Sequence, residues 1–144
     1  MIKFIKIILS LITFLFLTNN SFADDYYEQA LEKFKKKDYD KAKFLFERNI
    51  VFNPKDANSY LYLAKIFQEK ENKREEVKNL NTTLLLDPSN EDATLRLMDI
   101  AVEKSNYSEV KELSEKFVKI CKNLCKENDR ILKSLKDLEP KNES

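Results

Sequence analysis

The chain of 144 residues contains no glycine. Tight β-hairpin turns and β-bulges need residues at positive φ, a region that glycine adopts without steric cost. Folds that depend on such turns are therefore disfavoured, and we expect an all-α fold. At this length the chain is suited to one compact domain and is too short for two independently cored ones.

Two further absences limit the chemistry that this chain can support. It has no histidine and no tryptophan, and without glycine it has no glycine-rich phosphate loop. Catalysis by imidazole and metal sites built on histidine are thereby excluded. We expect a protein that is not an enzyme and that has no cofactor and no metal site.

Residues 1–23 have the layout of a signal peptide. Lys3 and Lys6 give a positive start, an apolar run of 11 residues follows, and a polar stretch ends at Ala23. We expect cleavage between Ala23 and Asp24, which predicts a periplasmic or secreted protein. A retained anchor is the alternative, although a membrane span needs about 20 apolar residues.

The charge of the remaining chain is balanced, with 24 basic and 25 acidic residues once residues 1–23 are removed. The only basic run consists of Lys33 and the three lysines at 35–37, and it is interrupted by Asp38 and Asp40. It is more typical of a solvated helix face than of a nucleic-acid site, which needs several phosphate contacts. We expect no nucleic-acid partner, no small-molecule substrate, and membrane contact only through an uncleaved signal.

A period of 34 residues separates Pro54 from Pro88. Between and around these prolines, apolar residues recur at spacings of three and four, which indicates helices. The pattern predicts six helices, at about 25–36, 39–51, 57–69, 73–86, 91–104 and 107–123. Their connections are so short that neighbouring helices must be antiparallel. A seventh helix is expected at 127–138, before a polar tail at 139–144.

The residues that recur with this period resemble those of a tetratricopeptide repeat (TPR) protein. The first repeat supplies Tyr26, Ala30, Ala42, Phe46 and Pro54, and the second supplies Tyr60, Leu63, Ala64, Phe67, Leu80 and Pro88. The second repeat has Glu76 in place of a small residue, and the third repeat is degenerate. An unrelated helical bundle is the alternative.

The resemblance implies a TPR-like α-solenoid of about three helix-turn-helix repeats plus a C-terminal capping helix. The domain would span 24–138, with repeats at about 24–56, 57–90 and 91–123 and the capping helix at 127–138. The family usually places glycine in the turn inside each hairpin, where this chain has Lys37, Glu71 and Ser105. We expect each of them to be left-handed at a cost of about 1 kcal/mol.

The resemblance also implies a concave groove, lined by the first helix of each repeat, that holds a segment of a partner protein. The matching positions are Tyr27, Leu31, Phe34, Asn58, Leu61, Tyr62, Lys65, Asp92, Leu95, Arg96 and Asp99. The family's version that grips a C-terminal carboxylate needs Lys and Asn where this chain has tyrosine and leucine, and only Arg96 agrees. An apolar or amphipathic segment is therefore expected, with the alternative that the leucines and tyrosines are core.

Cys121 and Cys125 are the only cysteines. On a continuous helix their α-carbons would lie about 6 Å apart, within the range that a disulfide spans. Export favours oxidation, so we expect a structural disulfide before the capping helix. Two free thiols, or redox or metal chemistry, are the alternatives.

These expectations combine into one functional hypothesis. The chain is expected to be a non-catalytic protein-binding module, an adaptor or assembly factor of the bacterial cell envelope. A self-associating structural module, as a homo-oligomer, is the alternative, and a thiol-redox protein that uses Cys121 and Cys125 is a further one.

Overall fold

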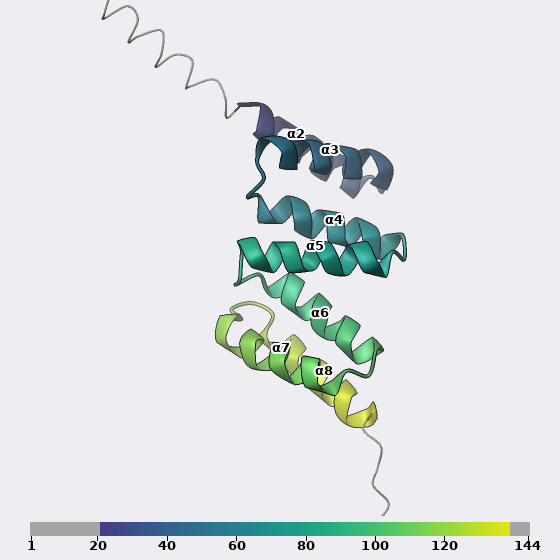
Figure 1. Ribbon diagram of the computed structural model, residues 1–144, viewed down its shortest axis with the longest axis vertical. Coiled ribbons are helices and arrows are strands. Elements are labelled where there is room, and N and C mark those ends of the chain that lie inside the picture. Colours follow the sequence, from purple (N-terminus) through teal and green to yellow (C-terminus); the bar gives the residue numbers. More distant parts are fainter. Residues whose placement is uncertain (1–20, 139–144) are drawn as a thin grey trace, which may run out of the picture. The chain divides into compact units, whose positions relative to one another are not determined.

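The computed structural model describes the backbone of residues 21–138 and the side chains of residues 26–136. Within this range the chain forms α-helices and no strand, so the prediction of an all-α fold is confirmed. The helices are α2 (Ser21–Lys35), α3 (Tyr39–Phe52), α4 (Ala57–Glu69), α5 (Lys73–Leu86), α6 (Glu91–Glu103), α7 (Tyr107–Ile120) and α8 (Cys125–Leu138) (Figure 1). The predicted signal segment, apart from its last three residues, and the predicted polar tail lie outside the described residues.

The turns inside three successive helix pairs are built alike, at intervals of 34 residues. Each turn holds one residue at positive φ, and these are Lys37 (58°), Glu71 (55°) and Ser105 (52°). In the middle turn, the amide of Glu71 donates to Gln68 O at 3.0 Å and that of Asn72 to Phe67 O at 2.9 Å. This is the Schellman arrangement, which satisfies the last carbonyls of the first helix. The left-handed turns predicted without glycine are confirmed.

The residue after each of these turns starts the next helix. Asp38, Asn72 and Asn106 each accept the backbone amide three residues ahead through a side-chain oxygen. Such a cap satisfies one of the free amides of the first turn and stabilises a helix by about 1 kcal/mol. One left-handed residue followed by one capping residue therefore forms each hairpin.

The chain divides into two compact units, with the boundary between Ser59 and Tyr60, inside α4. In the first unit α2 and α3 form a hairpin in which Ala30, Ala42 and Phe46 are fully buried. The two alanines let the helices approach closely, as the small residues at these repeat positions predict.

A buried polar cluster follows α3 within the same unit. The side-chain amide of Asn49 donates to Asp56 Oδ2 at 2.7 Å and to Ser59 Oγ at 2.8 Å, and Ser59 Oγ donates to Asp56 Oδ2 at 2.7 Å. Because these bonds connect the end of α3 to the start of α4, they fix the corner that contains Pro54.

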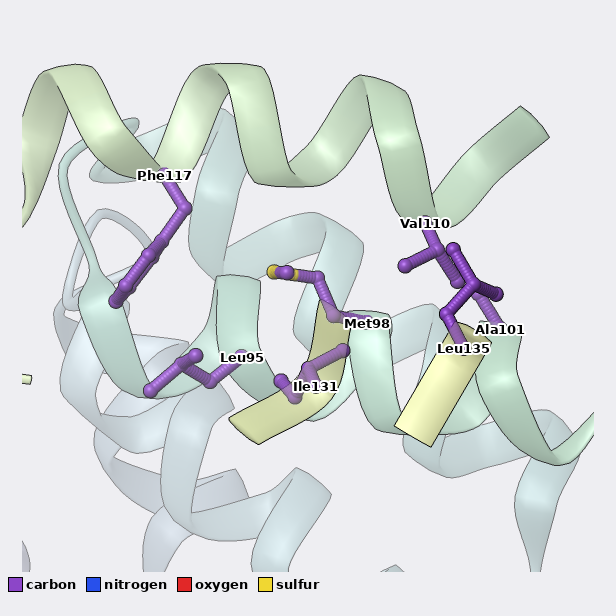
Figure 2. Close-up of a cluster of buried hydrophobic side chains, with 7 residues drawn as sticks. All are labelled: Leu95, Met98, Ala101, Val110, Phe117, Ile131 and Leu135. Carbon is purple, nitrogen blue, oxygen red and sulfur yellow. The ribbon is translucent and has the colours of Figure 1, made fainter. Parts of the chain in front are cut away.

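The second unit has two clusters of buried apolar side chains. The first joins α4, α5 and α6 and consists of Leu61, Ala64, Leu80, Ala93, Leu97 and Ile100. The second joins α6, α7 and α8 and consists of Leu95, Met98, Ala101, Val110, Phe117, Ile131 and Leu135. Figure 2 shows Phe117 and Val110 of α7 pointing toward α6. Because α8 contributes Ile131 and Leu135, it covers the apolar side of the last helix pair.

The region before α8 differs from the prediction. The sixth helix was expected to continue to residue 123, but α7 ends at Ile120 and Cys121 is extended, with φ −64° and ψ 138°. The last helix starts at Cys125 instead of residue 127. The two cysteines therefore bracket a loop and do not share a continuous helix. The reason is a tertiary contact of Glu91, described below.

No helix in the described part of the chain is both long enough and apolar enough to span a membrane.

Candidate functional site

The second unit contains a pocket of about 300 Å³ with an apolar floor. Its floor is formed by Leu61 and Ala64 of α4, Leu80 of α5, Leu95 of α6, and Leu124 of the loop before α8. Leu61 and Leu95 are only 6% and 8% exposed, because most of their surface packs in the two core clusters. Most of the surface of Leu61 and Leu95 therefore lies in the core, and the remainder faces the pocket.

The rim of this pocket is charged and balanced. Its charged residues are Lys65 of α4, Asp92, Arg96 and Asp99 of α6, and Glu127 and Arg130 of α8. All six belong to ion pairs within the unit. The exposed side chain of Gln68 is the neutral member of the rim.

Two of these ion pairs join rim residues that lie on different helices. Lys65 Nζ lies 3.3 Å from Asp92 Oδ2, and Arg130 Nη2 lies 3.2 Å from Asp99 Oδ1. Arg130 also donates to Glu127 at 2.7 Å, and this bond, with the nearby Asp99, raises the pKa of Arg130. The pairs are largely exposed, so each stabilises the unit by about 1 kcal/mol or less. Their consequence is that the rim offers no uncompensated charge to a ligand.

Arg96 is engaged with carboxylates of its own unit. Its Nε donates to Glu76 Oε1, and its Nη1 lies 3.4 Å from Glu103 Oε1. Lys73 Nζ lies 3.2 Å from Glu76 Oε2 and 3.0 Å from Glu103 Oε2, which closes a network of two cations and two anions. Partial burial opposes the charge of Arg96, but Glu76 and the other carboxylates raise its pKa overall. The one position that matched a carboxylate clamp is thus already occupied.

Glu76 stands at the repeat position that holds Ala42 in the first repeat and Val110 in the third. All three side chains are buried, Glu76 to 1% exposure. A carboxylate in such a place needs opposite charges and hydrogen bonds. Arg96 provides a hydrogen bond and a charge, and Lys73 provides a second charge. The departure from a small residue at this position is therefore compensated by two basic residues nearby.

The structure brings together most of the predicted groove residues of the second unit. Those that line the pocket are Leu61, Lys65, Asp92, Leu95, Arg96 and Asp99. Tyr62 does not line it but lies beside it, with Lys65 Nζ 5.3 Å from its ring centroid.

The other predicted groove residues, which are Tyr27, Leu31, Phe34 and Asn58, belong to the first unit. Tyr27 packs edge-on against Phe46 at 5.8 Å between ring centroids, and Phe34 packs against Tyr39 at 5.6 Å. Tyr27, Leu31 and Phe34 are half-buried, and Asn58 is exposed. Both aromatic residues therefore contribute to the packing of the α2–α3 hairpin.

Sequence reasoning missed the contribution that the last helix and the loop before it make to the pocket. Leu124, Glu127 and Arg130 line it, although α8 was expected only to cap the third repeat. The apolar stripe of this helix indicates which side is buried, but its charged side looks like any solvated face. No local signal distinguishes Arg130, because its role depends on Asp99 lying opposite on α6.

Glu91, at the start of α6, holds the loop between α7 and α8. Its carboxylate accepts backbone amides from three consecutive residues, Lys122 at 3.0 Å, Asn123 at 3.1 Å and Leu124 at 2.8 Å. These hydrogen bonds lower the pKa of Glu91, and the bond from Leu124 has the largest effect. If α7 continued, these three amides would donate to carbonyls of the helix and not to Glu91. The contact with Glu91 therefore explains why α7 ends at Ile120.

The same loop is bracketed by the two cysteines. Their sulfur atoms are bonded in the structure, and the α-carbons lie 5.3 Å apart. The loop is therefore held at both ends by the disulfide and along its amides by Glu91.

The fold and the repeated turns define this protein as a TPR-like α-solenoid. It is similar to the TPR2B domain in the pHsp70 complex of yeast Sti1, with a TM-score of 0.71 and 18% identity over 80% of this chain and 96% of that one. The first TPR of Spaghetti (RPAP3), bound to the HSP90 peptide SRMEEVD, gives a TM-score of 0.70 with 17% identity over 82% and 94% of the two chains.

A third similar structure is the type III secretion chaperone SycD of Yersinia enterocolitica in complex with a peptide of the translocator YopD. Its TM-score is 0.70, with 13% identity over 82% of this chain and 92% of that one. No protein-family model and no curated protein matches the sequence. The likeness at these identities is one of fold.

Proposed function

We propose that this protein is a non-catalytic protein-binding module that takes an apolar side chain of a partner segment into the pocket between α4, α6 and α8. The observation that carries the proposal is the combination of an apolar floor with a rim whose charged residues are all paired. Such a site excludes water from an apolar anchor and has no free cation to hold a terminal carboxylate. Anchors that fill a pocket of this kind supply most of the affinity at protein interfaces.

The solved structures of similar fold support this proposal. Three of them hold a partner or a partner's peptide, as their descriptions state for Sti1, RPAP3 and SycD. The proposal differs from a clamp for an acidic C-terminus, because Arg96 is bound to Glu76 and Glu103. An amphipathic segment, with one apolar residue for the floor and polar residues for the rim, fits the site better.

The cellular role that we propose is that of an adaptor or assembly factor in the bacterial cell envelope, in the periplasm or secreted. Two features support it, the signal-like layout of residues 1–23 and the paired cysteines in the loop before α8. Disulfides persist in oxidising compartments such as the periplasm. Recovery of the chain from the periplasm with Asp24 as its first residue is the expected result of export and cleavage.

The binding proposal is tested with a photo-crosslinking amino acid at Gln68, on the rim, and at Glu115, an exposed position on α7, as the matched control. Mass spectrometry of the crosslinked product names the captured segment, and a synthetic copy is then titrated against the protein. A Gln68→Trp substitution should block the pocket and weaken binding by about tenfold or more, or about 1.4 kcal/mol. Glu115→Trp is the control and should bind the segment as the parent protein does. If Gln68→Trp also binds it with unchanged affinity, the segment binds outside this pocket.

Self-association is the second candidate function. One solved SycD structure of similar fold is described as an alternative dimer, with a TM-score of 0.69. Light scattering of the purified protein decides between the two candidates. A stable dimer in which the residue at position 68 is protected from crosslinking to other proteins would favour self-association over partner binding.

A further inference from the structure

The first unit carries an exposed strip of aromatic and aliphatic side chains on α3. Phe44, Arg48 and Val51 lie at helical spacings of four and three, so they share one face, and Phe52 lies beside them. Phe44, Val51 and Phe52 are 59%, 74% and 54% exposed. Tyr26 of α2 completes the set, because its ring stacks on Phe52 at 5.6 Å with an interplanar angle of 9°. We call these five residues the α3 strip.

The exposure of the strip is unusual within the described residues. Five large hydrophobic side chains are exposed there, and three of the five belong to the α3 strip. Scattered apolar residues on a surface need no explanation, but a contiguous group is typical of an interaction site. The strip shares no residue with the lining of the pocket in the second unit.

Arg48 lies at the centre of the strip and is held by aromatic rings. Its guanidinium carbon lies 5.5 Å from the centroid of Tyr26 and 5.9 Å from that of Phe44. Its Nη2 also lies 3.5 Å from the Tyr26 hydroxyl. Stacking of this kind orders the guanidinium before any ligand arrives.

No carboxylate pairs with Arg48 among the side chains that the structure describes. The acidic residue that precedes it on α3, Glu47, has another partner, because it accepts from Lys43 at 2.6 Å. When aromatic rings stack on the faces of a guanidinium, its N–H groups at the edge can still donate hydrogen bonds. A carboxylate suits them because its two oxygens can accept two parallel N–H bonds. The strip therefore combines apolar area with one ordered positive charge that no carboxylate of residues 26–136 pairs with.

We propose that the α3 strip docks a partner protein segment in which an aspartate or glutamate lies next to a large apolar residue. The carboxylate would accept from Arg48, and the apolar residue would cover Phe44 and Val51. Arginine and aromatic residues are enriched among the side chains that dominate binding energy at interfaces. This surface is a second docking site, and it does not depend on the function proposed for the pocket.

A selection of short random peptides displayed on phage, with the purified protein immobilised, tests the proposal. The selected peptides are synthesised with a fluorescent label, and their affinities are measured by anisotropy. Peptides that carry an acidic residue beside an apolar one should be enriched. Their affinity should fall by about tenfold or more in Arg48→Ala and in Phe44→Ala. The same loss is expected when the acidic residue of the peptide is changed to its amide.

Matched controls separate this site from the rest of the chain. Arg74→Ala removes an exposed arginine from α5, and Gln68→Trp blocks the pocket, and both should leave the affinity unchanged. Circular dichroism checks that each variant is folded. Selected peptides that bind Arg48→Ala and Phe44→Ala as tightly as the parent protein would overturn the proposal.

Two other results would also overturn it. Sedimentation with phosphatidylglycerol vesicles that depends on Phe44, without any Arg48-dependent peptide, would assign the strip to a membrane surface. A dimer in light scattering that is lost in Arg48→Ala would assign it to a second copy of the chain.

Discussion

Glu91 and Leu124 are joined by a hydrogen bond of 2.8 Å between the Glu91 carboxylate and the Leu124 backbone amide, across 33 residues of sequence. The bond fixes the loop before α8 to the start of α6. Because Leu124 is part of the pocket floor and Arg130 on α8 is part of its rim, the position of this loop shapes the pocket.

Glu91→Gln should lower the melting temperature at neutral pH and make it less sensitive to acid. The amides of the loop lower the pKa of Glu91 in the folded protein. Its contribution to stability is therefore fully present above the ordinary glutamate pKa and is lost as the pH falls through the lower folded value. Thermal melts from pH 7 to below about pH 4 should show the difference between parent and variant shrinking with acid.

Glu115→Gln is the matched control, since Glu115 is exposed on α7. Its difference from the parent protein should stay small at every pH. A Glu91→Gln difference that is constant or grows in acid would contradict the assignment of the loop bonds.

Glu71→Gly should stabilise the protein by about 0.5–1 kcal/mol. The left-handed conformation of Glu71, with φ 55°, is strained for a side chain with a Cβ atom, and glycine removes this strain at the cost of a more flexible unfolded chain. Urea unfolding followed by circular dichroism measures the change. Glu115→Gly, inside α7, should instead destabilise by about 1 kcal/mol, and stabilisation by both substitutions would contradict the explanation.

The features of the fold that were predictable from sequence are those with a local cause. Pro54 and Pro88 mark equivalent corners, and the left-handed residues Lys37, Glu71 and Ser105, which the family resemblance implies, are each followed by a capping Asp or Asn. These signals depend on a few neighbouring residues. The helix pairs therefore follow from the sequence without knowledge of the tertiary structure.

The features that were not predictable depend on contacts between distant residues. Nothing near Ile120 indicates that α7 ends there, since the competing acceptor is Glu91, on another helix. Arg130 and Asp99, which form an ion pair, are likewise far apart in the sequence, so neither residue indicates the other. The pocket was predicted on its α4 and α6 sides and missed on its α8 side for this reason.

Glu76→Ala should destabilise the protein, although it restores a small residue at this repeat position. The substitution leaves Arg96 and Lys73 without their buried carboxylate, and the loss of one partner of a buried pair costs about 2–3 kcal/mol. The double variant Glu76→Ala with Arg96→Leu should recover most of this loss. Urea unfolding of the single and double variants measures the coupling, and purely additive losses would show that the pair is not coupled.

Replacement of both cysteines, Cys121→Ser with Cys125→Ser, should lower the free energy of unfolding by about 2 kcal/mol at most, because the disulfide closes a short loop. The effect on binding should be local. Leu124 lies inside this loop and on the pocket floor, so a looser loop should weaken capture of a pocket-bound segment by up to about tenfold, or 1.4 kcal/mol. Titration of the crosslinked segment against the oxidised parent and the double variant measures this loss. If the double variant loses stability but binds the segment as tightly as the parent protein, Glu91 alone positions Leu124. In that case, substitution of Glu91 in the double-serine variant should weaken binding.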